Sequence, residues 1–266
     1  MERIMSSVIM ITILTCLVSC NAWSQQGNLS GVRRSAFDLG FSFMSVRDEA
    51  LNRIIHKGPG LHVDWYLELP GRGGISIIEL GVGSGFLKSD FEEEISSFRF
   101  SGSAGFTYLW PLCINDQSPH FYLGGKVNAR TAIEYFDNWD ESHFYWTTAY
   151  TTGAGFRIEY TIRGNSMIRI EADIPLFSMV SRPPDRFLYT QSSPALKDIL
   201  KDVNYDLSLL LPREYREFDM RVKYAVKNRK RIMPEIFWRL HYMSIHKDGS
   251  ARMKYLLQSI GVEFDI

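Results

Sequence analysis

The sequence has few cysteines, no excess of charge of one sign and no long apolar run after its first eighteen residues. Only 3 of its 266 residues are cysteine, and two of them, Cys16 and Cys20, lie in the first twenty. This number excludes a disulfide framework and a structural zinc site. Because 30 basic residues balance 30 acidic ones, the basic excess typical of nucleic-acid binding is missing. No zinc signature, phosphate loop or dinucleotide fingerprint occurs, so we expect no metal, no cofactor and no nucleic-acid partner.

The amino terminus has the layout of a secretory signal. Residues 4–18 form an apolar stretch after Arg3, and small and polar residues follow. The stretch is shorter than the roughly 20 residues that a membrane-spanning helix needs. We therefore expect the segment to be removed from the mature protein.

Two cleavage routes fit this signal. Ala22 and Ser24 occupy the small-residue positions of an ordinary signal-peptidase site. This route, which we favour, makes residues 1–24 the signal and residues 25–35 a short N-terminal segment. Alternatively, residues 17–20 (LVSC) resemble a bacterial lipobox, in which Cys20 is lipidated and becomes the first residue.

From Ala36 onward, apolar and polar residues alternate with a period of two, which predicts β-strands. The pattern recurs at 98–110 and 121–133, and turn-like segments separate the repeats. A soluble sandwich alternates too, so alternation alone does not decide the class. In residues 61–69, the two faces are Leu61, Val63, Trp65, Leu67, Leu69 and His62, Asp64, Tyr66, Glu68.

Strand length and number favour an all-β protein, an antiparallel transmembrane up-and-down β-barrel. Most of the predicted strands reach the ~9 to 11 residues that a tilted strand needs to cross a bilayer, whereas strands of soluble proteins average ~5 to 6. We predict about ten strands, with eight or twelve as alternatives, in a single barrel domain over residues 36–266. The predicted strands are 36–45, 59–69, 74–87, 96–111, 119–133, 143–162, 166–178, 217–226, 235–245 and 252–266.

The connections alternate between long and short, as in barrels with long outer loops and short periplasmic turns. The long ones are 46–58, 88–95, 134–142, 179–216 and 246–251. With this orientation, outward aromatic residues fall near strand ends, where an aromatic belt would meet the membrane interfaces. They include Phe37, Phe43, Trp110, Phe144, Trp146, Tyr160, Tyr224 and Trp238.

The signal, the alternating strands and a last strand with Ile260, Val262, Phe264 and Ile266 outward resemble the small bacterial outer-membrane β-barrel proteins of the broad OmpA and OmpX type. The resemblance covers residues 36–266 and is one of pattern, without a subfamily motif. It implies residence in the bacterial outer membrane and contact with its lipid. Such barrels often end on an aromatic residue, whereas here Asp265 and Ile266 follow Phe264.

With the apolar face toward lipid, charged residues of both signs face the interior in nearly balanced numbers. Buried charges persist when they are paired and hydrogen-bonded, and a barrel of about ten strands is narrow. We therefore expect a cross-linked interior without a large general-diffusion pore. The predicted charge lattice is Asp38, Asp64, Glu68, Glu79, Arg99, Lys126, Arg130, Arg157, Glu159, Arg169, Glu171, Asp173, Asp219, Arg221, Lys223 and Arg239.

One group of residues could carry catalysis. His62 and Asp64 share the inward face of one predicted strand, close to its outer end, and Ser42 could approach from the neighbouring strand as a nucleophile. Such spacing is common by chance on a polar face, so we favour a structural role. The leading hypothesis is a non-enzymatic barrel for envelope structure or surface interaction. The alternatives are a hydrolase acting on lipid or peptide, and a narrow channel or transporter for a small or apolar solute.

The long outer segment 179–216 is the least uniform part of the chain. Its apolar residues from Leu196 to Leu210 have helical spacing, which predicts an amphipathic helix that caps the mouth, lies on the membrane or docks a protein partner. A competing interpretation makes residues 205–211 an additional strand, with another earlier in the segment, which raises the number of strands to twelve. The simplest alternative is a self-packed loop without a partner. Acidic residues in the loops at 90–94 and 137–141 could bind divalent cations, although such residues are more often simply solvated.

Overall fold

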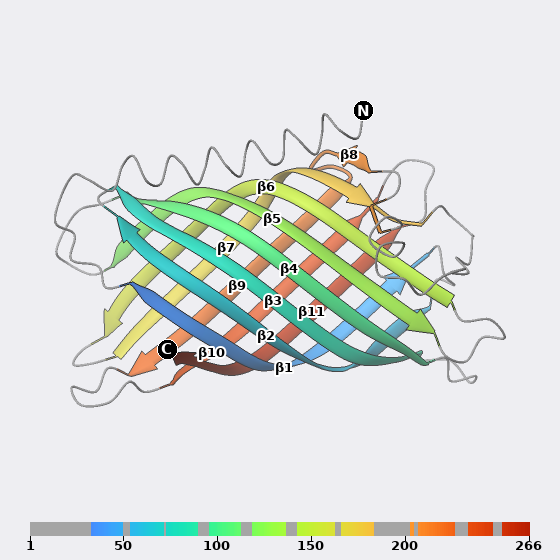
Figure 1. Cartoon of the computed structure of the whole chain (residues 1–266), viewed down its shortest axis with the longest axis horizontal. Coiled ribbons are helices and arrows are strands. Elements are labelled where there is room, and N and C mark those ends of the chain that lie inside the picture. The colour runs from blue at the N-terminus through green and yellow to red at the C-terminus, as the bar shows by residue number, and fades with distance from the viewer. Residues whose placement is uncertain are drawn as a thin grey trace.

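The polypeptide forms a closed antiparallel β-barrel in which the first and last strands pair with each other (Figure 1). The computed structural model describes residues 33–49, 54–71, 73–89, 96–112, 119–136, 143–162, 166–183, 203–204, 207–226, 234–246 and 252–266. The strands are β1 (Arg34–Asp48), β2 (Ile55–Gly71), β3 (Gly74–Ser89), β4 (Ser96–Pro111), β5 (His120–Phe136), β6 (His143–Ile162), β7 (Ser166–Ser181), β8 (Ser208–Leu210), β9 (Tyr215–Val226), β10 (Glu235–Ile245) and β11 (Met253–Asp265).

Ten of these strands form the barrel wall, which confirms the predicted fold class and strand number. Neighbours in sequence pair from β1 to β7, then β7 pairs with β9, and β11 closes the ring on β1. Closure gives each of the ten wall strands a partner on both sides, which is what a strand-built structure needs in lipid, where water cannot satisfy backbone groups.

The short strand β8 does not belong to the wall. Among the described strands it pairs with β7 only, at Ser178–Val180, past Asp173, the last residue of β7 that pairs with β9. Between β8 and β9 the chain turns, and the carbonyl of Leu211 accepts bonds from the N–H groups of Glu214 and Tyr215. On the other edge of β7, the ladder with β6 shifts register next to Pro175, which has no N–H to donate. Residues 205–211 therefore do not add a membrane-crossing strand, and Leu210 lies in β8 rather than in a helix.

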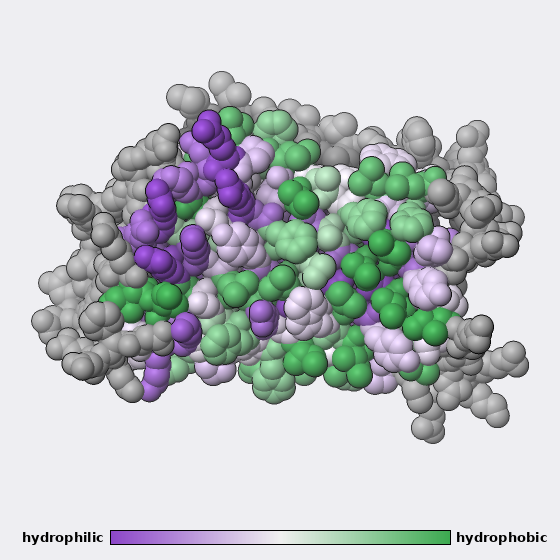
Figure 2. Space-filling model, turned by 180° about the vertical axis from the view of Figure 1, so that it is seen from behind, coloured by the Kyte–Doolittle hydropathy of each residue, from purple (hydrophilic) through white to green (hydrophobic). Residues whose placement is uncertain are grey.

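The barrel is apolar outside and polar inside. Large apolar side chains on its outer face are widely exposed, such as Phe41 at 72% and Ile260 at 60%. Figure 2 shows them as a hydrophobic expanse across the middle of one face. A soluble monomer rarely exposes apolar patches larger than a few hundred Å², so this surface belongs in a lipid bilayer. No helix among the described residues is long and apolar enough to cross a membrane.

The two ends of the barrel differ. We call the end with Arg34 and Asp265 the turn end, because short connections such as 72–73 join the strands there. The other, the loop end, carries the long connection between β7 and β8. The remaining connections do not follow the predicted alternation of long and short: 112–119 and 227–234 at the turn end have eight residues each, whereas 49–54, 90–95 and 137–142 at the loop end have six, because the strands extend further than predicted there. In Figure 1 the C-terminus marks the turn end at the left.

Most of the aromatic residues predicted to face outward near strand ends do so. Phe37, Phe43, Trp110, Tyr160, Tyr224 and Trp238 are exposed. Trp146 is an exception: it is 2% exposed, and its Nε1 donates to Oγ of Ser181 at 3.3 Å. The expectation of an exposed Trp146 was wrong because the outer face of β6 is covered there. Placement of these residues in a membrane interface stays a prediction.

Several predictions concern segments outside the described residues. These are the signal and Cys20, the acidic residues of the connections 90–95 and 137–142, most of the predicted helix and the side chain of Phe144.

Candidate functional site in the barrel interior

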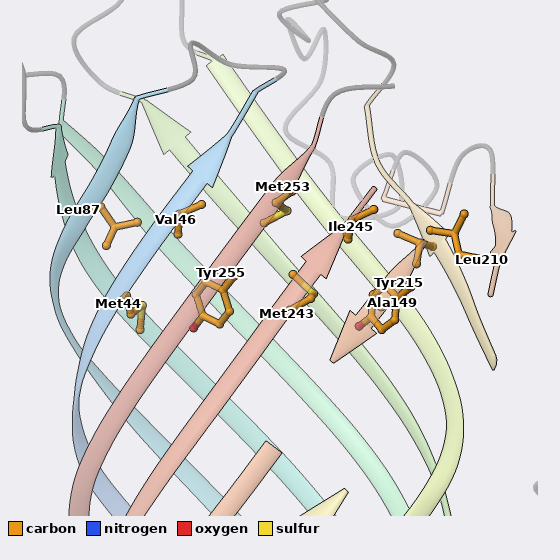
Figure 3. Packing of buried hydrophobic residues seen from close by; sticks show 11 residues of the cluster. Met44, Val46, Leu87, Ala149, Leu210, Tyr215, Met243, Ile245, Met253 and Tyr255 are labelled. Carbon is orange, nitrogen blue, oxygen red and sulfur yellow. The ribbon is translucent and has the colours of Figure 1, made fainter. Parts of the chain in front are cut away.

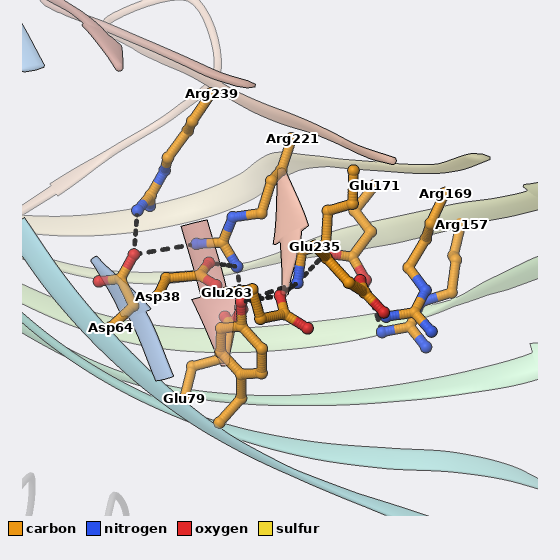
Figure 4. Close-up of polar contacts among 12 residues, drawn as sticks. Asp38, Asp64, Glu79, Arg157, Arg169, Glu171, Arg221, Glu235, Arg239 and Glu263 are labelled. Carbon is orange, nitrogen blue, oxygen red and sulfur yellow. Dashed lines mark hydrogen bonds and ion pairs between the residues drawn. The ribbon is translucent and has the colours of Figure 1, made fainter. Parts of the chain in front are cut away.

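Asp64 is the centre of the charge network inside the barrel. Its Oδ2 lies 2.7 Å from Nη1 of Arg239 and 3.1 Å from Nη2 of Arg221 (Figure 4). Asp64 is on β2, whereas Arg221 and Arg239 are on β9 and β10, which do not pair with β2. These ion pairs therefore span the lumen instead of following the wall.

Two cations of β5 extend the network across the other side of the lumen. Nζ of Lys126 is 2.9 Å from carboxylates of both Glu79 on β3 and Asp173 on β7. Nη1 of Arg130 is 2.5 Å from Oε1 of Glu217 on β9. Since β5 pairs only with β4 and β6 among the described strands, each of these contacts bridges strands that are not neighbours.

A second layer of pairs lies nearer the turn end. Arg157 donates to Glu68 at 2.7 Å across the lumen and lies 2.6 Å from Glu171. Lys223 is 2.7 Å from Glu263 and donates to the hydroxyl of Tyr66 at 2.8 Å. Glu263 is 1% exposed, so its carboxylate is shielded from water by the wall and by its partners.

All residues of the predicted lattice face the interior, and each makes at least one ion pair within 4 Å. The pairing partners could not be derived from the sequence, because they depend on how strands from opposite sides of the barrel meet. Because every second residue of a strand faces inward, the same alternation would have identified further charged residues of the interior. The interior charges that the prediction omitted include Arg34, Asp48, Glu134, Arg182, Glu217, Glu235 and His241.

Arg34 joins the first strand to the last two at the turn end. Its guanidinium is 2.6 Å from both Glu235 of β10 and Asp265 of β11, and it also contacts Glu263. Tyr66 of β2 donates to Glu263 at 2.5 Å. The seam between β1 and β11 is thus fixed by side chains as well as by its backbone ladder.

Toward the loop end, the interior contains an apolar cluster, and the ion pair of the buried Asp48 with Arg182, 2.6 Å apart, lies at the end itself. Buried side chains from eight strands form one cluster, which we call the apolar tier (Figure 3). Below it, the guanidinium of Arg99 lies 4.6 Å from the ring centroid of Tyr255 and 3.2 Å from Glu134. The apolar tier consists of Met44, Val46, Leu87, Ala149, Val180, Leu210, Tyr215, Met243, Ile245, Met253 and Tyr255.

The space left between these layers is small. One cavity of about 60 Å³ lies between the apolar tier and the charges, with His62, Arg130 and Met243 among its lining residues. Another of about 50 Å³ lies among the charges nearer the turn end, lined in part by Lys126 and Glu171. One water occupies roughly 10 to 15 Å³ on this measure, so each cavity has room for a few waters and no larger solute.

Ser42, His62 and Asp64 are not assembled into a catalytic group. Oγ of Ser42 and both ring nitrogens of His62 make no hydrogen bond in the described part of the chain, and two arginines occupy Asp64. His62 lies near the middle of β2 rather than close to its outer end. Its ring packs on Phe237, with centroids 5.7 Å apart. It also lies over Gly40, where an added Cβ would be 2.3 Å from Cε1 of His62.

His241 and Asp219 form a second histidine and carboxylate pair, 3.3 Å apart on adjacent strands. The same histidine contacts the Arg130 guanidinium, and both members of the pair are buried. We interpret the pair as part of the charge network. Among the described residues, no group of three or more His, Cys, Asp or Glu side chains could hold a metal ion.

No protein-family model matches the chain, and no curated protein matches it. Among solved structures it is similar to the outer membrane protease OmpT from Escherichia coli, with 6% identity, a TM-score of 0.51 and coverage of 91% of this chain and 100% of that one. The β domain of the Bordetella autotransporter BrkA is 9% identical over 88% and 100%, with a TM-score of 0.42. Ail from Yersinia pestis is 11% identical over 87% and 98%, with a TM-score of 0.32. The likeness to OmpT concerns the fold, which is that of bacterial outer-membrane β-barrels.

Proposed function

We propose that this protein is a non-enzymatic β-barrel of the bacterial outer membrane that serves envelope structure or surface interaction. In this proposal the barrel is a rigid scaffold, and the connections at its loop end are the parts that act on the surroundings. The closed interior carries the proposal. Ion pairs such as Asp64 with Arg221 and Arg239 span the lumen, and the two cavities described above hold only about 50 and 60 Å³.

Two features support a scaffold over a channel. In the charged layers, each described cation lies within 4 Å of at least one carboxylate, so a passing ion would have to replace an existing pair. The apolar tier above them packs buried side chains from eight strands inside the loop end of the barrel. A polar solute would therefore have to displace both kinds of contact to cross.

Epitope labelling on intact cells tests where the loops lie. A short epitope inserted in the connection 184–202 should be labelled by an antibody added to intact cells. The same epitope in the connection 227–233, at the other end of the barrel, should be labelled only after permeabilisation. Labelling of the second site alone on intact cells would contradict the proposed orientation.

A loop exchange tests surface interaction itself. Residues 184–202 are replaced by a flexible Gly and Ser linker of equal length, which leaves the strands intact. We expect cells with this variant to lose the aggregation or surface adhesion that the unchanged protein confers, while the amount of folded barrel in the membrane stays the same. Equal adhesion by both cell types would contradict a role for this loop.

A further inference from the structure

Lysine and arginine side chains gather on the outer face of the barrel at its loop end. Arg216, Lys254 and Arg47 are exposed on β9, β11 and β1, and Lys57 and Lys88 follow on β2 and β3. On each strand, the cation lies nearer the loop end than an outward apolar residue of the same strand. The two are two positions apart, except Arg47 and Phe43, which are four apart. These five residues, the basic belt, therefore border the apolar surface where a bilayer meets its headgroups. Figure 2 shows hydrophilic side chains gathered toward the left, which is the loop end in that view.

The belt places like charges side by side. In the strand register, Arg47 lies directly opposite Lys254, and Lys57 directly opposite Lys88. Like charges at directly opposed positions destabilise a sheet. Arg47, Arg216 and Lys254 form no ion pair with an acidic residue in the described part of the chain, in contrast to the interior cations. An anion from outside the protein would relieve the repulsion between Arg47 and Lys254.

The belt is confined to one end and one side. Outward positions at the loop ends of β4 to β7 carry Phe98, Tyr135 and Met179, with no cation among the described residues. Toward the turn end, the outward positions of the described strands carry no lysine or arginine, although Arg33 precedes β1 and the connection 227–233 has cations in its sequence. The arc from β9 through β1 to β3 is thus the cationic part of the strand surface.

We propose that the basic belt binds the phosphate groups of anionic lipid in the leaflet at the loop end. A lipid suits this position because its headgroup would meet the cations while its acyl chains cover the outward apolar residues below, such as Phe43 and Leu256. The chemistry is charge-assisted hydrogen bonding to phosphate oxygens, for which arginine is well suited. This proposal rests on the part of the proposed function that places the barrel in the outer membrane. It does not depend on the barrel interior being closed.

Titration with a phosphorylated lipid tests the belt. Folded full-length protein in neutral detergent is titrated with bisphosphorylated lipid A and, separately, with inorganic phosphate. The test variant is Arg47→Gln/Arg216→Gln/Lys254→Gln. The matched control, Lys227→Gln/Arg229→Gln/Lys230→Gln, removes three cations at the opposite end. A cation near an anionic membrane surface contributes on the order of fivefold in affinity, so three contribute about 100-fold.

We expect the test variant to bind lipid A about 100-fold more weakly, the control variant to bind like the unchanged protein, and inorganic phosphate to show no saturable binding. Equal binding by the test variant, or an equal loss in the control, would overturn the proposal. Saturable binding of inorganic phosphate with the same residue dependence would reduce the belt to a simple anion site and overturn the assignment to lipid.

If the triple variant does not fold, the stability of a single variant against denaturant tests the same proposal. Lys254→Gln alone removes one of the opposed charges, so in neutral detergent without anionic lipid it should unfold at a higher denaturant concentration than the unchanged protein. Added lipid A should reverse this order. A Lys254→Gln variant that is less stable than the unchanged protein in both conditions would contradict the proposal. This result does not depend on whether the barrel interior is closed.

Discussion

At the scale of single residues, the interior is held by charges whose partners come from distant strands. Asp64 faces two arginines, and Arg34 faces three carboxylates. Such groups are costly to bury alone, so each carboxylate is needed to keep its cations in place. His62 acts differently: its ring has no hydrogen-bond partner among the described residues and fills the space over Gly40 beside Phe237.

Asp64→Asn should strongly destabilise the barrel, because it leaves Arg221 and Arg239 without their shared carboxylate. Loss of one member of a buried ion pair costs roughly 3 to 5 kcal/mol. Urea unfolding in detergent, followed by tryptophan fluorescence, measures the change. Ser42→Ala is the control, since the Ser42 hydroxyl has no partner in the described part of the chain, and it should change stability little. Equal effects would argue against the charge network.

Gly40→Ala should destabilise the barrel by roughly 1 to 3 kcal/mol, because the added methyl group overlaps the His62 ring. His62→Ala removes that ring, so the double variant should recover part of the loss. A double-mutant cycle on the free energy of unfolding measures this coupling. Strictly additive effects would show that the ring does not occupy this space.

At the scale of elements, each strand presents one face to lipid and the other to the lumen. Strict alternation made the strands predictable to within a few residues, as for the predicted 74–87 and the observed Gly74–Ser89. Prediction failed where a strand is not exposed or paired in the same way as the rest of the wall. Alternation gives no sign that the outer face at Trp146 is covered, nor that β8 pairs with β7 alone.

Substitution of two leucines on β3 tests which face of the strand is inside the barrel. Leu87 is fully buried in the apolar tier, whereas Leu80 faces outward. In lipid or detergent, Leu87→Ala should cost roughly 2 to 5 kcal/mol, because the cavity stays empty. Leu80→Ala should cost less than half as much, since acyl chains fill the space. A larger cost for Leu80→Ala would contradict the inside-out assignment.

At the scale of the whole molecule, the sequence predicts which charged residues face the interior but not which of them pair with each other. The sixteen lattice residues follow from parity alone, because inward positions repeat every second residue. Their pairing depends on strand tilt and on distances across the lumen, which one sequence does not encode locally. The apolar tier escaped prediction because inward Met44, Leu87 and Met243 interrupt the polar face of their strands near the loop end.

The closed interior is the central claim, and planar-bilayer recording tests it most directly. Purified protein is inserted into the bilayer next to a neutral variant with Asp64, Lys126, Asp173 and Arg239 all changed to Ser, and flotation of parallel proteoliposomes verifies insertion of both. The unchanged protein should give no stable conductance steps. The variant, which loses the cross-lumen pairs of Asp64 and Lys126, should give at least brief openings. Stable, large conductance from the unchanged protein would contradict a closed barrel.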